Sequence, residues 1–294
     1  MKNKIKVAFQ GERGAFSEEA GLKFFGKNIE TLGFETLNEV FEAVEKKKVD
    51  FGIVPVENSI EGTVRKGYEL FLNYNVSPFA EVIHKISHCL ISLPGETLKS
   101  IKVVYSHPQA LGQCSKFLEK QKYKIVPFYN TAGAVKMIKE KKLKHAGAIA
   151  SERAGKIYKM KILKKGIENN SQNYTRFLVI AKDKETIPTG KDKTSLIFTL
   201  KHVPGSLFRA LEVFAKRKIN LTKIESIPIP EKPWEYNFLV DFEGHLKDKK
   251  VSLALDELKT KTTFLKVIGS YPKANFLRKN LIKLKNDKNK IHLA

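Results

Sequence analysis

The sequence predicts an α/β protein of two domains, and three observations support this prediction. Residues 1–182 repeat one unit, in which a strand is followed by a polar helix cap and a helix. That repeat is typical of an α/β domain with mainly parallel sheets. Residues 183–193 are polar and contain one proline and one glycine, which indicates a linker. Residues 194–272 then follow the order β-α-β-β-α-β, which is the pattern of a ferredoxin-like domain.

The composition excludes several classes of protein. Hydrophobic residues make up 42% of the 294 residues, which is enough to build folded cores. No run approaches the ~20 apolar residues of a membrane span, and the basic start followed by Ile5–Phe9 indicates a strand rather than a secretory signal. Cys89 and Cys114 are the only cysteines, so we expect neither a disulfide framework nor a metal cluster. We expect a reducing, cytoplasmic location and no membrane partner.

The chain is strongly basic, with a net charge of 54 − 31 = +23. Such an excess first suggests a nucleic-acid partner. However, the excess is mostly lysine and is spread along the whole chain, without an aromatic-rich basic platform or a recognition-helix signature. We therefore favour a lysine-rich surface without a nucleic-acid partner, whose positive field would also favour small anionic substrates.

The first elements bring polar residues to the ends of strands. Residues 4–9 alternate as a strand, and a loop with two glycines leads to Ser17, which can cap a helix that starts at Glu18. A helix that follows such a loop is a plausible anion site, although the glycine spacing matches neither a dinucleotide fingerprint nor a P-loop. Residues 37–47 are helical by spacing, and residues 51–56 form a buried strand that ends in the polar segment 57–64. Open α/β sheets place ligands at such strand ends.

The middle of the chain continues the pattern. Residues 81–93 indicate one strand, with His84 and His88 on one face; no third metal ligand is evident, so we interpret both as surface or packing histidines. Residues 102–105 form a strand, and Ser106 can cap a helix that runs through residue 118. Residues 124–129 and 146–150 are further strands, and Asn130 and Ser151 are expected to cap the helices that follow them.

The segment Asn169–Phe177 (N-N-S-Q-N-Y-T-R-F) is rich in neutral hydrogen-bonding side chains and stands directly before an apolar strand. Thr175 offers a hydroxyl, and Arg176 offers a planar guanidinium that suits a carboxylate. As an isolated stretch it could be a polar loop. Since several helix N-termini are expected at the same strand ends, a site for a small polyanion is the sharper interpretation.

Four spaced motifs and the second domain resemble a known family. The motifs are G-E-R-G-A-F-S-E-E-A, V-P-V-E-N-S-I-E-G-T-V, S-H-P-Q-A-L-G-Q-C and N-Y-T-R-F, in this order. Together they resemble the prephenate dehydratase family. The second domain resembles an ACT regulatory domain, through P-G-S-L at Pro204–Leu207, I-N-L-T-K-I-E-S at Ile219–Ser226, and the strand Tyr236–Asp241. The resemblance covers about residues 4–272.

The resemblance implies a fold and its boundaries. Residues 1–182 are expected to form a two-lobed, periplasmic-binding-like (type II) catalytic domain, with lobes near 1–78 plus 168–182 and near 79–167, and with the site between the lobes. Residues 194–272 are expected to form the ACT domain. The basic tail, residues 273–294, holds seven Lys or Arg and one Asp, and we expect a surface helix that frays.

The family reaction removes carbon dioxide and hydroxide from prephenate, gives phenylpyruvate on the way to phenylalanine, and implies no metal or organic cofactor. The resemblance implies that Thr175 assists the departing hydroxide; since a threonine hydroxyl is a poor acid, we expect hydrogen-bond stabilisation to matter more than full proton transfer. Arg176 and capped helix ends are expected to hold the carboxylates of the dianion. Ten further positions are carried over as substrate-binding: Phe16, Ser17, Glu57, Asn58, Ser59, Ser106, His107, Gln109, Asn173 and Phe177. For Ser106 and His107, capping is an equally good interpretation.

The ACT resemblance implies phenylalanine as an effector. It would bind at an interface between two ACT domains, so a homodimer or homotetramer is expected. The residues carried over for this site are Gly205, Ser206, Leu207, Asn220, Leu221, Glu225 and Ser226. The sequence departs from the family here, because the usual E-S-R-P is Glu225-Ser226-Ile227-Pro228 and lacks the arginine. No helical mutase-like segment precedes the first motif, which predicts a monofunctional dehydratase.

Three alternatives remain open at this stage. The substrate could be arogenate, the transaminated analogue of prephenate, because both compounds carry the same ring. The two-lobed fold could instead serve a non-catalytic binding or sensor protein. The charge could finally indicate a nucleic-acid-binding protein with an amino-acid-sensing ACT domain.

Overall fold

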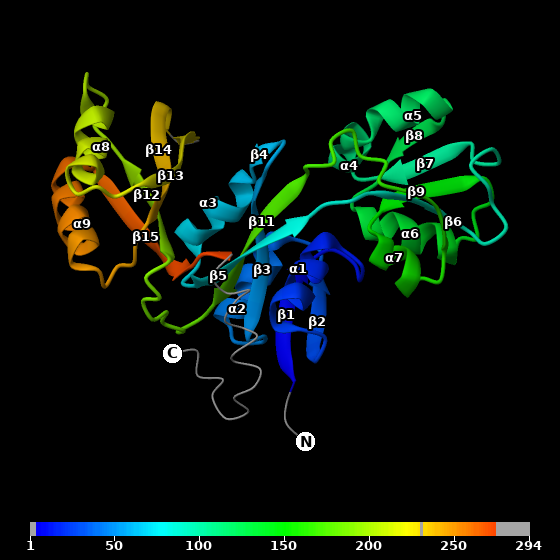
Figure 1. The fold of residues 1–294 in the computed structure, drawn as a ribbon, viewed down its shortest axis with the longest axis horizontal. Helices are drawn as coiled ribbons and strands as arrows, with labels where there is room; N and C mark the ends of the chain where they lie inside the picture. Colours follow the sequence, from blue (N-terminus) through cyan, green and yellow to red (C-terminus); the bar gives the residue numbers. More distant parts are fainter. Residues whose placement is uncertain (1–3, 230–231, 275–294) are drawn as a thin grey trace. The chain divides into compact units, whose positions relative to one another are not determined.

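The computed structural model describes residues 4–229 and 232–274, so most of the basic tail (273–294) lies outside the described residues. The chain divides into two compact units (Figure 1). One contains residues 4–67 and 82–177, and the other contains residues 68–81 and the described residues from 178 on. Each unit is described by itself. Among the described residues, no helix is long and apolar enough to cross a membrane.

The first sheet has the strand order β2-β1-β3-β11-β5, with β4 paired to β3. Its strands are β1 (Ile5–Gln10), β2 (Ile29–Phe34), β3 (Phe51–Asn58), β4 (Gly62–Thr63), β5 (Ser77–Lys85) and β11 (Tyr174–Ala181). The helices α1 (Phe16–Phe25), α2 (Leu37–Glu45) and α3 (Arg65–Asn73) connect them. Strands β1, β2 and β3 are parallel, so their carboxyl ends lie at one edge. Strand β11 enters the sheet only after the chain has formed the second lobe.

The second lobe contains a sheet of order β10-β6-β9-β7-β8. Its strands are β6 (Cys89–Ser92), β7 (Val103–Ser106), β8 (Lys124–Pro127), β9 (Ala146–Ala150) and β10 (Lys161–Lys165). Helices α4 (Pro108–Gln113), α5 (Ser115–Gln121), α6 (Thr131–Glu140) and α7 (Glu152–Ile157) surround this sheet (Figure 1). The pairs β7–β8 and β7–β9 are parallel, whereas β6 runs antiparallel to both β9 and β10. The sheet is therefore mixed, not mainly parallel as the repeat predicted.

Several local predictions were wrong. The stretch 81–93 is two strands in two different sheets, so His84 and His88 do not share one strand face. The predicted helix after Ser106 is broken at Cys114 into α4 and α5. Helix α1 begins at Phe16 after the N-cap Ala15, so Ser17 lies in its first turn and does not cap it. Asn130 and Ser151 do cap α6 and α7, because their side chains accept hydrogen bonds from Gly133 and Ala154.

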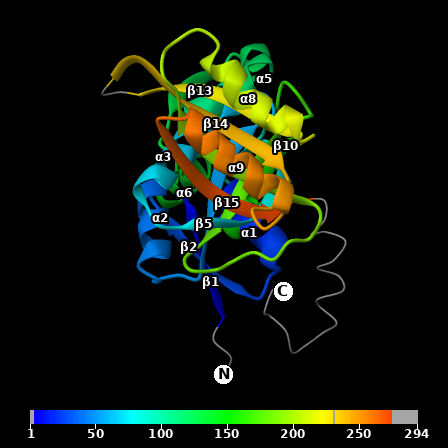
Figure 2. The same ribbon diagram turned by 90° about the vertical axis from the view of Figure 1, so that its left-hand side faces the viewer.

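The C-terminal domain has the predicted order β-α-β-β-α-β. It contains β12 (Asp192–Thr199), α8 (Ser206–Lys216), β13 (Leu221–Ile229), β14 (Lys232–Glu243), α9 (Lys249–Lys261) and β15 (Phe264–Pro272). The antiparallel sheet has the order β13-β14-β12-β15. Both helices cover one face of this sheet (Figure 2). Phe198, Phe214 and Phe242 belong to the core that they bury. Among the described strands, β13 and β15 lie at the two edges of this sheet, and edge strands can pair with another chain.

Candidate active site

A cavity of about 350 Å³ lies within the first unit and is lined by residues of both lobes. The first lobe contributes the loop after β1, the start of α1, and the ends of β3 and β11. The second lobe contributes α4 and the loop before α6. Seven of the predicted site residues line it: Phe16, Ser17, Asn58, His107, Gln109, Thr175 and Phe177. The four spaced motifs therefore meet at one cavity.

Strand geometry decides which residues of T-R-F face the cavity. Successive side chains of a strand point to opposite faces, and in β11 it is Thr175 and Phe177 that line the cavity. Arg176 lies between them, is buried, and donates from Nε to Glu57 Oε2 at 2.9 Å. On β3, Asn58 lines the cavity, and the residue before it, Glu57, lies on the opposite face of the strand. The structure therefore does not bring Arg176 or Glu57 into the cavity lining, although the sequence predicted both as substrate-binding.

Asn58 fixes the orientation of the Thr175 hydroxyl. Its Oδ1 accepts hydrogen bonds from the backbone N–H groups of Ile60 and Glu61, both at 3.0 Å, so its amide nitrogen points the other way. That nitrogen, Nδ2, donates to Thr175 Oγ1 at 3.0 Å and to Asn173 Oδ1 at 2.7 Å. Because Thr175 Oγ1 already accepts this bond, its own proton is directed elsewhere. Thr175 is only 8% exposed and faces the cavity, where the hydroxyl can donate to a bound molecule.

The polar chain continues from Asn173 to the second lobe. Asn173 Nδ2 donates to Gln113 Oε1 at 2.9 Å, and His88 Nε2 contacts the same oxygen at 3.0 Å. Since Gln113 Oε1 is an acceptor, His88 carries its proton on Nε2. Burial lowers the pKa of His88, against the Gln113 hydrogen bond and the charge of Glu168, which both raise it, so the ring is neutral at neutral pH.

His88 is therefore a cavity residue and not a surface histidine. It is 2% exposed, lines the cavity, and packs edge-to-face against Phe16 with ring centroids 5.3 Å apart. Among the described side chains, its Nδ1 atom is buried and has no hydrogen-bond partner. His84, in contrast, lies on β5 and pairs with Glu19 at 2.9 Å.

The N-termini of two helices lie at the cavity. The first-turn residues Phe16 and Ser17 of α1 and Thr131 of α6 line it, and both helices are ten residues long. No side chain caps the N-terminus of α1, so its first-turn N–H groups are not occupied by a cap. Among the described residues that line the cavity, none is a lysine or an arginine. The positive end of a helix dipole and its free N–H groups favour an anion.

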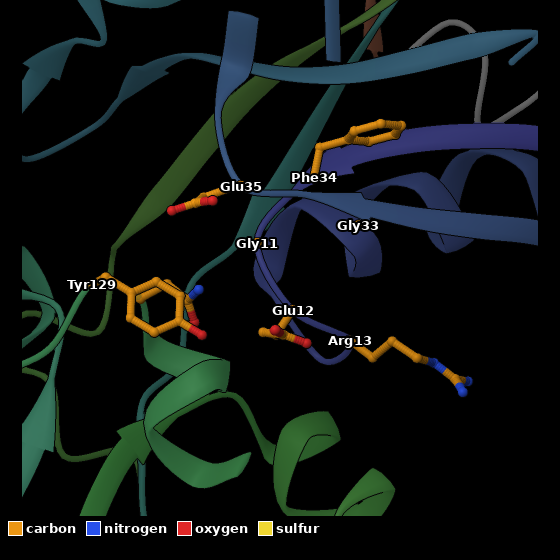
Figure 3. Close-up of a pocket in the computed structure, with 8 residues that line it drawn as sticks. Gly11, Glu12, Arg13, Gly33, Phe34, Glu35 and Tyr129 are labelled. Carbon is orange, nitrogen blue, oxygen red and sulfur yellow. The ribbon is translucent and has the colours of Figure 1, made fainter. Parts of the chain in front are cut away.

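A second cavity of about 370 Å³ adjoins the first and shares Gly11, Glu35, Tyr129 and Asn130 with it. Figure 3 shows Glu35, Tyr129 and Glu12 around this space, whereas Arg13 extends away from it. Burial, followed by the charges of Glu12 and Glu35, raises the pKa of Tyr129, so its hydroxyl stays protonated.

Hydrogen bonds next to the N-terminus of α1 join the two lobes. Glu18 is 1% exposed; burial alone would raise its pKa, but hydrogen bonds from Gly14, Arg153 and Thr31 outweigh burial and hold the pKa below its usual range. Ser151 Oγ donates to Gly14 O at 2.7 Å, and Arg153 Nε donates to Glu18 at 3.2 Å. These bonds join the two lobes next to the N-terminus of α1.

Two other predicted residues, Ser59 and Ser106, lie outside the cavity lining. Ser59 Oγ accepts from the Tyr174 N–H at 2.9 Å and donates to Gln172 O at 3.0 Å, so it fixes the loop before β11. Ser106 is buried and donates to Ile149 O at 2.6 Å, and it does not cap α4. The α4 cap is His107, whose Nδ1 accepts from the Gln109 N–H at 3.3 Å.

Gln113 and Glu35 were missed by the sequence reasoning. Gln113 stands four residues after Gln109, and residues with this spacing share one face of a helix, so the motif S-H-P-Q-A-L-G-Q-C could have revealed it. Glu35 stands outside all four motifs.

Two family models match the chain, one for each domain. Residues 7–185 match the family model described as prephenate dehydratase, and residues 194–259 match the ACT domain. This chain belongs to the prephenate dehydratase family. It is therefore a dehydratase, a carbon–oxygen lyase, with a C-terminal ACT domain.

Named relatives and solved structures resemble the chain over most of its length. The chain is 45% identical to a bifunctional chorismate mutase/prephenate dehydratase of Aquifex aeolicus over 93% of this chain and 75% of the relative. It is 42% identical to arogenate dehydratase/prephenate dehydratase 2 of Arabidopsis thaliana, over 92% of this chain and 73% of that protein. A prephenate dehydratase from Arthrobacter aurescens in complex with L-Phe superposes with a TM-score of 0.84 at 28% identity, covering 92% of this chain and 91% of that chain. A structure described as a quorum quenching acylase, GqqA, superposes with a TM-score of 0.83 at 29% identity, over 92% and 99% of the two chains.

The predicted effector residues lie at two ends of the ACT sheet. Gly205 is the N-cap of α8, with φ 76°, and Ser206 and Leu207 follow it, after the end of β12. Leu221 begins β13 and pairs with Phe242, which pairs with Thr194 near the opposite end of β12. Asn220 immediately precedes Leu221, whereas Glu225 and Ser226 lie further along β13. One ACT domain therefore does not bring Gly205 and Asn220 together.

Proposed function

We propose that this protein converts prephenate to phenylpyruvate, carbon dioxide and hydroxide, with Thr175 as the residue that stabilises the departing hydroxyl group. The observation that carries this proposal is the bond from Asn58 Nδ2 to Thr175 Oγ1, at 3.0 Å, in a cavity that four family motifs share. It leaves the Thr175 proton free to donate to a leaving oxygen.

The electrons that move in this reaction come from bonds of the substrate, so the protein does not have to supply or accept them. The ring carboxylate loses carbon dioxide, its bonding electrons enter the ring, and the ring hydroxyl leaves with the electron pair of its C–O bond. The product ring becomes aromatic, which supplies much of the driving force. The remaining tasks are to orient the substrate, exclude water and stabilise the leaving oxygen. A hydrogen bond from Thr175 serves the last of these without requiring full ionisation of a hydroxyl with a high pKa.

Helix ends suit the carboxylates of the substrate. The starts of α1 and α6 both face the cavity, and each presents backbone N–H groups at the positive end of a helix dipole. Arg176, in this proposal, holds Glu57 at the end of β3 and so fixes the neighbouring Asn58. The structure thus supports a positioning role for Arg176, in place of the direct carboxylate contact that the sequence suggested.

Phenylalanine is the proposed effector. The relative from Arthrobacter aurescens was solved with L-Phe, and this chain carries the same type of C-terminal domain. Because Gly205 and Asn220 lie at different ends of one ACT sheet, we propose that the effector binds between two copies of this domain. Equilibrium dialysis with millimolar phenylalanine, together with the mass of the free protein by light scattering, tests both the effector and the oligomer. The cytoplasmic location and the monofunctional state stay predictions.

Turnover tests the proposed reaction. Purified protein is incubated with prephenate, and phenylpyruvate is measured by its absorbance after addition of alkali. The proposal expects turnover that is proportional to enzyme concentration. Absence of turnover by folded protein, with either prephenate or arogenate, would contradict it and would favour a binding protein of the same fold.

A further inference from the structure

The active-site cavity holds a full negative charge. Among its described lining residues, Glu35 is the one carboxylate and none is a lysine or an arginine. The two lining histidines, His88 and His107, do not offset it, because burial lowers the pKa of both. A lone carboxylate is unexpected in a cavity for a dianion. Because the Glu35 carboxylate repels a dianionic substrate, we expect it to have a function that offsets this repulsion.

The backbone of Glu35 is held firmly in place. Its N–H donates to Glu39 Oε2 at 2.9 Å, and its carbonyl oxygen accepts from Gln10 Nε2 at 3.3 Å. The next residue, Thr36, caps α2 in a capping box with Glu39. The adjoining loops are close together, since a Cβ atom on Gly33 would lie 2.3 Å from Gly11 O. Glu35 is thus presented to the cavity from a fixed backbone.

The carboxylate of Glu35 lacks the partners that other site carboxylates have. Glu12 pairs with Lys136 at 3.0 Å, and Glu57 pairs with Arg176 at 2.9 Å. Among the described residues, no side chain forms a hydrogen bond or ion pair with the Glu35 carboxylate. It lines both adjoining cavities and lies across from Tyr129 (Figure 3). A cationic group on a bound molecule can therefore approach it without breaking an existing pair.

The two candidate substrates differ in such a group. Prephenate carries a ketone and a carboxylate on its side chain, whereas arogenate carries an ammonium and a carboxylate there. Neither the ketone nor the carboxylate can donate to Glu35, and the carboxylate is repelled by it. The ammonium is a cation with three donors, and it pairs with a carboxylate.

We propose that Glu35 is a specificity-determining residue that binds the ammonium group of arogenate, so that this enzyme accepts arogenate and Glu35 raises its efficiency relative to prephenate. The inference rests on the proposed function, because it assigns the substrate of the same cavity. It adds a charge contact that the dehydration step itself does not require.

The test compares two substrates on the same enzyme. The ratio of kcat/KM for arogenate to kcat/KM for prephenate is measured for the parent, Glu35→Gln and Glu30→Gln. Glutamine keeps the shape of glutamate and removes its charge. Glu30 lies on β2, is exposed and lines neither cavity, so it is the matched control. Because both rates come from one preparation, the fraction of folded enzyme cancels in the ratio.

We expect the ratio of kcat/KM for arogenate to kcat/KM for prephenate to fall about tenfold in Glu35→Gln. This is the effect expected from losing one charge pair near a protein surface. The loss should appear in the arogenate reaction, while the prephenate reaction is unchanged or faster, and Glu30→Gln should leave the ratio within about twofold. A ratio that is unchanged in Glu35→Gln, or a parent that converts prephenate and not arogenate, overturns the role of Glu35 and leaves the proposed function intact. Turnover of neither substrate overturns both.

Discussion

The substitution Asn58→Asp replaces one NH₂ group with an oxygen in the buried chain that holds Thr175. In the parent, Asn58 Nδ2 faces three acceptors, at 2.7 Å from Asn173 Oδ1, 3.0 Å from Thr175 Oγ1 and 3.2 Å from Tyr174 O. The new oxygen cannot donate to any of them. The Thr175 hydroxyl would instead turn and donate its proton to the new carboxylate, because a carboxylate is a strong acceptor. The proton that we assign to the leaving oxygen is then no longer available.

The magnitude follows from the bonds that are lost. Loss of one preorganised donor in a transition state costs about 10²- to 10³-fold in kcat. Asn173 Oδ1 would also lose its buried donor, which lowers the free energy of unfolding by about 1–3 kcal/mol. We therefore expect kcat with prephenate to fall at least about 100-fold, in a protein whose unfolding remains cooperative.

Ser59→Ala is the matched control for this prediction. Ser59 lies next to Asn58 and bonds the same strand, but its hydroxyl contacts only backbone groups and lies outside the cavity. We expect its kcat to stay within about threefold of the parent, at a cost of about 1 kcal/mol in stability. The assay is phenylpyruvate absorbance at saturating prephenate, with thermal unfolding of each variant. A kcat for Asn58→Asp within about threefold of the parent would refute the orientation of Thr175 by Asn58.

Two further predictions concern stability. Because burial lowers the pKa of His88 below that of an unfolded histidine, the folded state binds fewer protons. The contribution of this residue to stability is therefore complete above about pH 6.5 and is lost as the pH falls below that value. His88→Gln, which can still donate to Gln113, should flatten the dependence of Tm on pH between about 7 and 5; an unchanged slope would exclude His88 as its source. Gly33→Ala should lower stability by about 1–3 kcal/mol, since its Cβ would lie 2.3 Å from Gly11 O, whereas Gly112→Ala, with no atom within 4 Å, should not destabilise. Equal Tm values for these two glycine variants would contradict the close approach at Gly33.

The fold could be predicted because its signals are local. The alternation of strand, cap and helix depends on hydrophobic period and capping residues, and Asn130 and Ser151 act as caps as expected. The order β-α-β-β-α-β of the ACT domain was likewise confirmed. The prediction of one strand for residues 81–93 was wrong, because periodicity does not show where an apolar segment passes from one sheet to another.

The site could be predicted in part, for a different reason. Motifs identified Thr175, Asn58 and Gln109, which the structure brings to one cavity. They did not show which side chains face it, because that depends on strand alternation at the start of β11, and Arg176 points to the other face. His88 is a packing histidine, one of the two interpretations that the sequence allowed, but its place in the cavity was not predicted because it depends on contacts with Phe16 and Gln113, which are distant in sequence.

The most direct measurement compares turnover of prephenate by the parent, Thr175→Ser and Thr175→Val. Serine keeps the hydroxyl, whereas valine has nearly the same shape and lacks it. We expect Thr175→Ser to keep kcat within about tenfold and Thr175→Val to lose about 100-fold or more, with similar thermal unfolding of both. Equal turnover by Thr175→Val and the parent would contradict the assignment of Thr175 as the group that stabilises the leaving hydroxyl.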